Sequence, residues 1–322
     1  MKRILQSIAF ALILLAGLPL TARAEDTLIP VGQIIGLELG DNTVTVAAFD
    51  DAFGCRAQDA GLRIGDEILA INDTPVRCAE DVRTALKTSG EHVELTVLRG
   101  SRRQKISITP AVTSDGPRLG VYLRQGITGI GTVTFYDPET HMFGTLGHGV
   151  NDAKGMLLRM HRGSAYEAAI QSVQKGKSGA PGQLKGCAVS PESIGSLLKN
   201  TPQGVFGICA IGWEGEPIPV ATWEEIHTGE ATIRSTIAGT AVCQYSVEIL
   251  KIYPKDRSDC RNLLLKVTDP TLLSATGGIV QGMSGSPIIQ DGKLVGAVTH
   301  VLVNDPTMGY GIFIENMLDA AA

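Results

Sequence analysis

Short apolar runs that glycine and proline interrupt fill the sequence from Arg118 to the C-terminus, and few of them have helical periodicity. Glycine accounts for 38 of the 322 residues, about 12%, where about 7% is usual. The stretches 129–150 and 287–301 read as strand pairs around turns at Asp137-Pro138 and Asp291-Gly292. Many short strands over this length predict a mainly β protein, with a barrel or sandwich in its C-terminal part.

The first 24 residues have the pattern of a signal peptide or N-terminal anchor. A basic start at Met1–Arg3 precedes an apolar stretch over 8–20, and residues 22–24 form an A-x-A cleavage site. The apolar stretch is short for a membrane-spanning helix, which needs about 20 residues. We therefore expect an exported chain.

Beyond this segment the chain has 25 basic and 33 acidic residues, and this negative balance disfavours nucleic acid as a partner.

Residues 25–112 form a first predicted domain. The stretch AGLRIGDEILAIN, residues 60–72, resembles the signature of PDZ domains, which have an α+β fold. In such domains a groove between a strand and a helix accepts an extended peptide as an added strand, and N–H groups of a loop hold its C-terminal carboxylate. The resemblance implies a groove lined by the helix over 80–87, and a C-terminal or internal peptide as partner. The residues that it assigns to the loop are Ile34, Ile35, Gly36 and Leu37.

All six cysteines lie beyond the N-terminal segment. An even number in an exported chain permits disulfides, and Cys55–Cys78 is the pairing that we expect first, because it stays within one domain. No two of the six form a CxxC pair, and no histidine lies at a zinc-ligand spacing from them. We therefore expect neither a metal nor another cofactor.

The stretch GMSGSP, residues 282–287, has the form of a turn that presents a nucleophilic serine. Hydrolysis through an activated serine requires a base within reach, a partner that orients the base, and N–H donors facing the developing oxyanion. Glycines allow the sharp turn, so Ser284 takes the nucleophile position and the N–H groups of Gly282 and Ser284 are the expected oxyanion donors. Ser286 is expected to pack and to form a local hydrogen bond.

The base must be a histidine, and two of the six fit. His148 lies between Gly147 and Gly149 at the end of a predicted strand, where small neighbours leave room for an imidazole to face a cleft. His300 is the alternative, since it follows Ser284 on a strand expected beside the serine turn. The glycine flanks favour His148.

The acid that orients the base is not determined by the residues alone. Asp269 ends a strand pattern 15 residues before Ser284, and Asp152 and Asp305 are alternatives. Asp269 and Asp305 each precede a proline, a pair that often simply caps a turn.

The stretches FYDPET, GTLGHGV and TDPTLLSATGGIVQGMSGSPIIQDGKLVGAVTH, together with the PDZ-like unit, resemble the stage IV sporulation protein B family of serine peptidases. The resemblance spans essentially the whole exported chain. It implies a chymotrypsin-like β-barrel serine peptidase domain over residues 113–322. It also implies a catalytic triad of Ser284, His148 and Asp269, in the roles of nucleophile, base and orienting acid.

Members of this family act in endospore formation. The resemblance implies an endopeptidase that is exported into the forespore intermembrane space, where the N-terminal segment can tether it to the membrane. There it would cleave a membrane-anchored regulator of an intramembrane protease, and itself, so that a late mother-cell sigma factor becomes active. The alternative is a catalytically inactive PDZ-containing signalling adaptor. A general quality-control PDZ protease is disfavoured, because in that class of protein the protease domain precedes the PDZ domain, whereas this chain has the reverse order.

Overall fold

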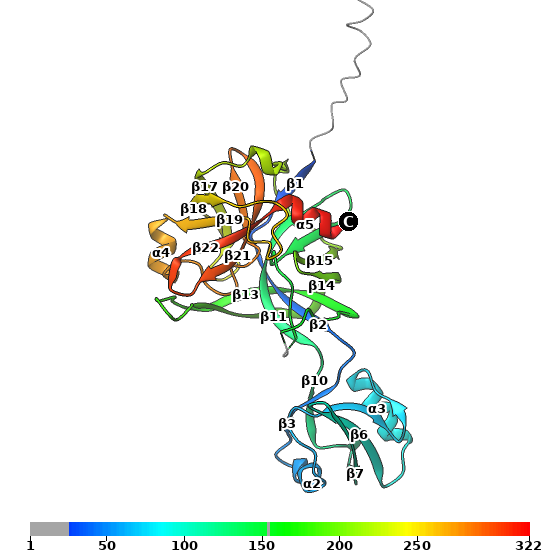
Figure 1. Ribbon diagram of the computed structural model, residues 1–322. Coiled ribbons are helices and arrows are strands. Elements are labelled where there is room, and N and C mark those ends of the chain that lie inside the picture. The colour runs from blue at the N-terminus through cyan, green and yellow to red at the C-terminus, as the bar shows by residue number, and fades with distance from the viewer. Residues whose placement is uncertain (1–25, 153–154) are drawn as a thin grey trace, which may run out of the picture.

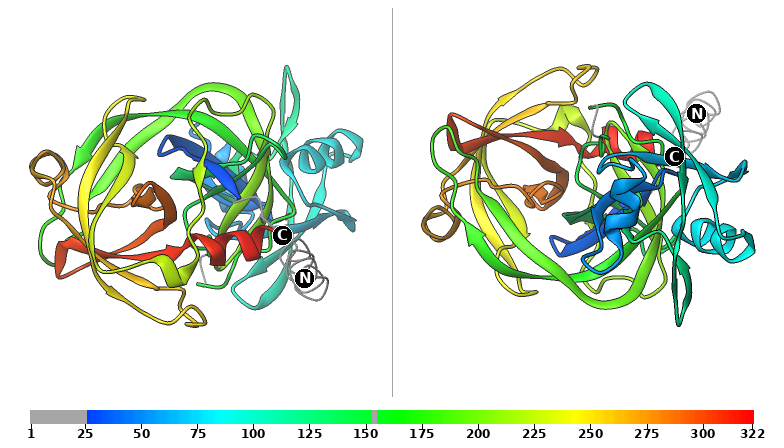
Figure 2. Two further views of the ribbon diagram at one scale, coloured as in Figure 1. Left: turned by 90° about the horizontal axis from the view of Figure 1, so that it is seen from above. Right: turned by 90° about the horizontal axis from the view of Figure 1, so that it is seen from below.

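The computed structural model describes residues 26–152 and 155–322, and strands dominate it. Two barrels lie side by side, with a smaller unit apart from them (Figures 1 and 2). The prediction of a mainly β protein with a barrel domain and a PDZ-like unit is confirmed. The segment 1–24, predicted to be a signal peptide or anchor, lies outside the described residues. Among the described residues, no helix is long and apolar enough to cross a membrane.

The first barrel draws strands from both sides of the PDZ-like unit. Its strands are β2 (Ile34–Gly40), β11 (Ile127–Tyr136), β12 (Met142–Thr145), β13 (Arg162–Gln174), β14 (Gln183–Thr201) and β15 (Gly204–Cys209). They follow the order β12-β15-β14-β13-β2-β11, and pairing of β11 with β12 closes the ring. Two further strands, β1 (Thr27–Pro30) and β16 (Ile218–Pro219), extend the sheet beyond β11. The predicted hairpin around Asp137-Pro138 is β11–β12.

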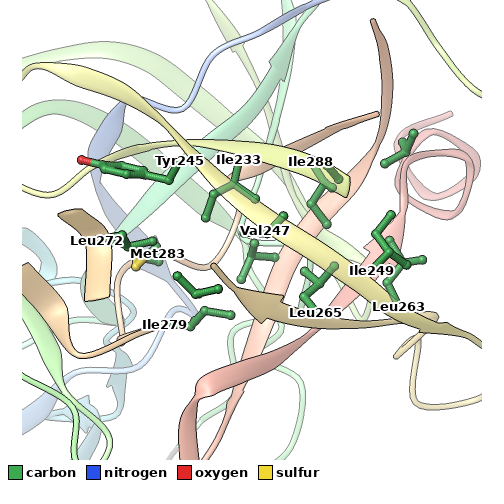
Figure 3. Close-up of a cluster of buried hydrophobic side chains, with 14 of the residues drawn as sticks. Ile233, Tyr245, Val247, Ile249, Leu263, Leu265, Leu272, Ile279, Met283 and Ile288 are labelled. Carbon is green, nitrogen blue, oxygen red and sulfur yellow. The ribbon is translucent and has the colours of Figure 1, made fainter. Parts of the chain in front are cut away.

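The second barrel is formed by the C-terminal part of the chain. Its strands are β17 (Gly229–Thr236), β18 (Val242–Ile252), β19 (Leu263–Val267), β20 (Pro287–Gln290), β21 (Lys293–Leu302) and β22 (Asp305–Phe313). They close in the order β17-β18-β19-β22-β21-β20, and their inward side chains fill a core that includes Ile233, Val247 and Leu265 (Figure 3). The turn between β20 and β21 has positive φ at both Asp291 and Gly292, as the sequence predicts for a tight hairpin.

Three short helical segments accompany the barrels. They are η1 (Trp223–Glu225), α4 (Pro270–Thr276) and α5 (Ile314–Ala321). Helix α4 connects β19 to the serine turn that precedes β20, whereas α5 ends the chain with its apolar side, including Met317, against β21 and β22. Helix α4 therefore bears directly on the position of the serine.

The PDZ-like unit is inserted between β2 and β11 (Figure 1). Its elements are β3 (Thr45–Phe49), α2 (Gly54–Asp59), β4 (Glu67–Ile71), β5 (Thr74–Pro75), α3 (Ala79–Thr88), β6 (Val93–Arg99), β7 (Arg102–Ile108), β8 (Ala111–Thr113), β9 (Gly116–Arg118) and β10 (Val121–Arg124). The predicted PDZ-like domain, residues 25–112, therefore differs from the observed unit at both of its ends, and so does the boundary with the predicted domain 113–322. Strands β1 and β2 belong to the barrel sheet, and β10 belongs to the PDZ-like sheet because it pairs with β3.

Local sequence explains the elements of this unit. The predicted helix is α3, which buries Val82, Ala85 and Leu86 on one face. The aspartate of the PDZ signature, Asp66, has a fully buried carboxylate that accepts two hydrogen bonds from the Arg99 guanidinium, at 2.8 and 2.7 Å. Burial raises the pKa of Asp66, but the bonds from Arg99 and from the Arg63 N–H outweigh burial and lower the pKa below its usual value. The pair fixes the loop before β4 against β6.

Candidate active site

Ser284 lies in the turn between α4 and β20, and its neighbours anchor that turn in the second barrel. The Met283 side chain is fully buried and packs in the cluster that includes Ile279 (Figure 3). Ser286 is also fully buried, and its hydroxyl donates to the Met283 carbonyl at 2.7 Å and lies 3.0 Å from the Ser235 hydroxyl. Ser284 itself is only partly buried. The expected local role of Ser286 is confirmed, and Ser284 is the serine that faces outward.

Strand β11 of the first barrel holds the other side of the same turn. The Thr132 N–H donates to the Ser284 carbonyl at 3.0 Å, and the Thr132 hydroxyl donates to the Gly282 carbonyl at 2.9 Å. The Thr134 hydroxyl donates to the Gly285 carbonyl at 2.7 Å. At Gly285, where φ is +97°, a Cβ would collide with the Thr132 carbonyl oxygen, so only glycine permits this approach. The nucleophile turn is thus fixed between the two barrels.

The two predicted oxyanion donors have no hydrogen-bond acceptor among the described residues. The hydrogen bonds among the described residues leave the N–H groups of Gly282 and Ser284 unused. The carbonyl groups of the same two residues are bound to Thr132. Both N–H groups are therefore available to a ligand at this turn, as an oxyanion site requires.

His148 follows β12, on a loop of the first barrel that packs against the second. A Cβ on Gly147 would lie 2.9 Å from the Thr299 methyl group and 3.0 Å from that of Ile312, so glycine allows the loop to approach β21 and β22. The His148 Nδ1 lies 2.9 Å from the Gly149 carbonyl oxygen. A carbonyl only accepts, so Nδ1 carries the proton and Nε2 has the free lone pair. Burial lowers the pKa of His148, although the Gly149 contact opposes this.

His148 and Ser284 line one cavity of about 490 Å³, together with Gly282 and His300. None of its described lining residues is an aspartate, glutamate, lysine or arginine, and aliphatic side chains such as Ile279, Val280 and Val301 predominate. The Ser284 hydroxyl donates to the Thr299 carbonyl at 2.7 Å. The structure therefore gathers the predicted nucleophile, base and oxyanion donors at one site, along with the alternative base.

In the structure, all three candidate acids accept hydrogen bonds from backbone N–H groups. Asp269 is the N-cap of α4, where its carboxylate accepts from the N–H groups of Thr271 and Leu272 at 2.9 and 3.0 Å and from that of Ser246 at 3.3 Å. Asp305 accepts from the N–H and hydroxyl of Thr307, and Asp152 accepts from the Met156 N–H. None of the three lines the cavity that contains Ser284 and His148.

The predicted peptide-binding loop is corrected by the structure. Ile34, Ile35, Gly36 and Leu37 lie in β2, which pairs with β11 along one edge and with β13 along the other. A strand with both edges occupied cannot accept a peptide as an added strand. The prediction was wrong because residues that precede the PDZ-like unit in sequence were taken to belong to it.

A groove of the required kind lies elsewhere in the PDZ-like unit. Among the described strands, β10 lies at a sheet edge and pairs with β3 alone, and a cavity of about 380 Å³ lies between it and α3. The lining residues include Val82, Arg83 and Leu86 of α3, Arg118 at the end of β9, Leu119 and Gly120 of the loop, and Val121 to Leu123 of β10. The segment Leu119-Gly120-Val121, an apolar-glycine-apolar step just before a strand, is the sequence signal that could have located this loop.

Cys55 and Cys78 are both free thiols, so the expected disulfide between them is absent from the structure. Cys55 lies on α2, whereas Cys78 is the N-cap of α3. In the described ranges no three histidine, cysteine, aspartate or glutamate side chains gather as a metal site.

Comparison with known proteins bears on the identity of the chain. No curated protein matches it. Among solved structures, the inactive form of the Rv3671c protease is similar at 14% identity and a TM-score of 0.35, covering 61% of this chain and 85% of that one. The active form, from M. tuberculosis, gives 12% identity and a TM-score of 0.37, covering 61% of this chain and 73% of that one. Scores of this size carry no argument about function.

Two family patterns match directly. The PDZ domain pattern matches residues 54–99, within the inserted unit. The SpoIVB peptidase S55 pattern matches residues 115–318, which is well over half of the chain and includes both His148 and Ser284. The chain therefore belongs to the SpoIVB peptidase S55 family.

Proposed function

We propose that this protein is a serine endopeptidase in which Ser284 is the nucleophile and His148 the general base. The observation that carries the proposal is that these two side chains, supplied by different barrels, line one cavity with the unused N–H groups of Gly282 and Ser284. A purely structural serine turn has no need of a histidine from the other barrel at the same cavity. Membership of a peptidase family supports the same assignment.

The reaction is acyl transfer. The His148 Nε2 takes the proton of the Ser284 hydroxyl as Oγ attacks the scissile carbonyl carbon, and the N–H groups of Gly282 and Ser284 stabilise the oxyanion. His148 then gives the proton to the leaving amine, and water attacks the acyl-enzyme in the same way. The Gly149 carbonyl holds the Nδ1 proton, so it keeps Nε2 available as the base.

The cleft favours apolar substrate side chains next to the scissile bond. Its described lining contains no charged side chain, and Ile279, Val280 and Val301 supply apolar surface near Ser284. A charged substrate side chain would be desolvated there without an ion partner, which is unfavourable. Peptides with apolar residues at these positions are therefore the preferred substrates, and peptides with lysine or aspartate there are poor ones.

The PDZ-like unit binds an extended peptide between α3 and β10. Among the described strands β10 pairs with β3 alone, which leaves its other edge for β-strand addition. Arg83 and Arg118 line the groove, where they pair with Glu80 and Asp115. The unit is joined to the first barrel directly through β2 and β11. A protein bound at the groove is thereby kept close to the peptidase domain, which raises its effective concentration at the cleft.

In the cell, the chain is exported and acts on a membrane-anchored regulator of an intramembrane protease, and on itself, during endospore formation. The family match and the signal-like pattern of the first 24 residues support this role. The catalytically inactive adaptor is the alternative.

Incubation of the purified chain with a set of unstructured polypeptides, followed by mass spectrometry, tests the peptidase activity. We expect cleavage by the native chain but not by Ser284→Ala. Equal cleavage by both would contradict the proposal, and cleavage by neither would favour the adaptor.

A further inference from the structure

The turn that joins β13 to β14 leaves the first barrel and packs on the second. Its Gly176 N–H donates to the Thr276 carbonyl of α4 at 2.8 Å, and its Gly179 N–H donates to the carbonyl of Val303, just after β21, at 2.9 Å. At Gly277, where φ is +77°, a Cβ would lie 2.5 Å from the Gly176 carbonyl oxygen, so glycine is needed for this contact. A segment of the first barrel is thereby fixed against the residues that lead into the nucleophile turn.

Residues 182–184, at the start of β14, bind the residue that precedes the first oxyanion donor. Gln281 donates its N–H to the Gly182 carbonyl at 2.9 Å, and its carbonyl accepts from the Leu184 N–H at 2.8 Å. These two bonds make a short parallel bridge between Gln183 and Gln281. The Leu184 side chain is buried, and a Cβ on Gly282 would lie 3.1 Å from its Cβ. Strand β14 therefore contacts the oxyanion site through both its backbone and a side chain.

The bond from Leu184 acts on the same peptide unit that carries the Gly282 N–H. The Gln281 carbonyl and the Gly282 N–H belong to one planar unit, and in a trans unit the two groups point in opposite directions. Because β14 binds the carbonyl, the N–H is turned away from β14, and it is one of the two unused N–H groups at the cavity. Gly282 has a φ of +100° and no Cβ, so its own backbone opposes rotation of this unit only weakly.

The second oxyanion donor is oriented in the same way, from within the turn. The Met283 carbonyl shares a peptide unit with the Ser284 N–H. It accepts from the Ser286 N–H at 3.0 Å and from the Ser286 hydroxyl at 2.7 Å. Each of the two donors thus has a bound carbonyl at the other end of its peptide unit. The carbonyl of Met283 is bound locally, whereas that of Gln281 is bound by a strand of the other barrel.

We propose that Leu184 is a positioning residue for the oxyanion site. Its backbone N–H keeps the Gln281–Gly282 peptide unit in the orientation in which the Gly282 N–H faces the developing oxyanion. This inference rests on the proposed peptidase function. Rotation of the unit would put a carbonyl oxygen where negative charge develops, so the bond from Leu184 favours the transition state. Leu184 does not line the cavity, and its contribution should therefore appear in kcat and not in KM.

The test removes this single N–H from the full chain. Replacement of Leu184 by its α-hydroxy acid turns the amide into an ester, so the donor to Gln281 is lost while the side chain stays. Outright loss of an oxyanion donor lowers kcat about 10²–10³-fold. Loss of the bond that orients the donor should cost less, about tenfold in kcat, with KM within about twofold of the native value. The affinity for a peptide aldehyde, whose adduct with Ser284 needs the oxyanion donors, should fall by the same factor.

The same replacement at Leu62 is the matched control. The Leu62 N–H donates to the Ala57 carbonyl at 3.0 Å within the PDZ-like unit, and the Leu62 side chain is buried like that of Leu184. A comparable hydrogen bond is therefore lost away from the cavity. Both esters should lower the thermal unfolding midpoint to a similar extent, whereas only the ester at Leu184 should lower kcat.

A second pair of variants replaces the esters if the chain with the ester at Leu184 does not fold. A Cβ on Gly182 would lie 2.3 Å from the Gln174 carbonyl oxygen and 2.4 Å from the Gly176 nitrogen, so Gly182→Ala displaces the start of β14 from Gln281. Gly90→Ala, where a Cβ would meet nothing within 4 Å, is its control.

The outcomes separate the inference from the function on which it rests. Native kcat in the variant that disturbs β14, an equal loss of kcat in its control, or a loss confined to KM would overturn the role of Leu184. Absence of cleavage by the native chain would instead overturn the proposed peptidase function.

Discussion

The Ser284 hydroxyl donates to the Thr299 carbonyl at 2.7 Å, so the nucleophile is held against β21 and its proton does not point to His148. Rotation about a single side-chain bond separates this arrangement from one in which the hydroxyl faces another side of the cavity. Catalytic hydrogen bonds in substrate-free enzymes often form only in the complex with substrate. We therefore expect the Ser284–His148 contact to form when a substrate carbonyl binds the oxyanion donors.

Substitution of the two serines of the turn should have different effects on activity and on stability. Ser284→Ala removes the nucleophile and should abolish cleavage of substrates and of the chain itself. Ser286→Ala removes a buried hydroxyl bonded to Met283 and Ser235, so it should reduce the free energy of unfolding by about 1 kcal/mol and lower activity only in part. Cleavage assays and denaturant titrations measure both effects. Self-processing by purified Ser284→Ala would refute the nucleophile assignment.

Two substitutions of Asp269 distinguish the role of a helix N-cap from that of a catalytic acid. Asparagine caps a helix as well as aspartate does, so Asp269→Asn should leave stability unchanged, whereas Asp269→Ala should lower the free energy of unfolding by about 1 kcal/mol. As an N-cap alone, Asp269→Asn should keep kcat within about twofold of the native value. In a Ser-His-Asp triad the same change lowers kcat about 10⁴-fold. Measured kcat values of the two variants therefore decide whether Asp269 orients His148.

The pH dependence of activity should reflect the burial of His148. The base must be neutral to accept the Ser284 proton, so kcat/KM falls as the pH falls through the pKa of His148 in the free enzyme. Burial lowers that pKa, and the half-maximal point should therefore lie below 6.5, the ordinary value for histidine. A pH profile of kcat/KM tests this. A half-maximal point above 6.5 would mean that a negative charge near His148 outweighs its burial.

Peptide binding by the PDZ-like unit should depend on the groove between α3 and β10. Arg83→Glu and Arg118→Glu each reverse a charge that lines it, and each should weaken binding of a peptide with a free C-terminal carboxylate about two- to fivefold. Arg102→Glu, at the exposed start of β7 and outside the groove, is the matched control. Fluorescence anisotropy with a labelled peptide measures the effect. A loss with Arg102→Glu equal to that of the groove variants would exclude this site.

Much of the peptidase site could be predicted because its signals are local. Ser284 and its glycines lie in one short turn, and Gly147, next to His148, is required by the close approach of the two barrels. Asp291 and Gly292 likewise specify their hairpin through backbone conformation alone. These features need no knowledge of distant pairing.

The parts that could not be predicted depend on contacts between distant segments. Residues 34–40 form β2, whose partners β11 and β13 both follow the inserted unit in the sequence. Assignment of this strand to the PDZ-like unit misplaced both the domain boundary and the peptide-binding loop. The spacing of Asp269 from Ser284 could not reveal that the Asp-Pro step begins α4 and directs the carboxylate to backbone N–H groups.

Labelling with a fluorophosphonate, with the adduct located by mass spectrometry, tests whether Ser284 is a nucleophile that His148 activates. We expect one adduct, on Ser284 of the native chain, which forms much more slowly in His148→Ala and does not form in Ser284→Ala. An adduct on another residue, or equal labelling of the native chain and His148→Ala, would contradict it.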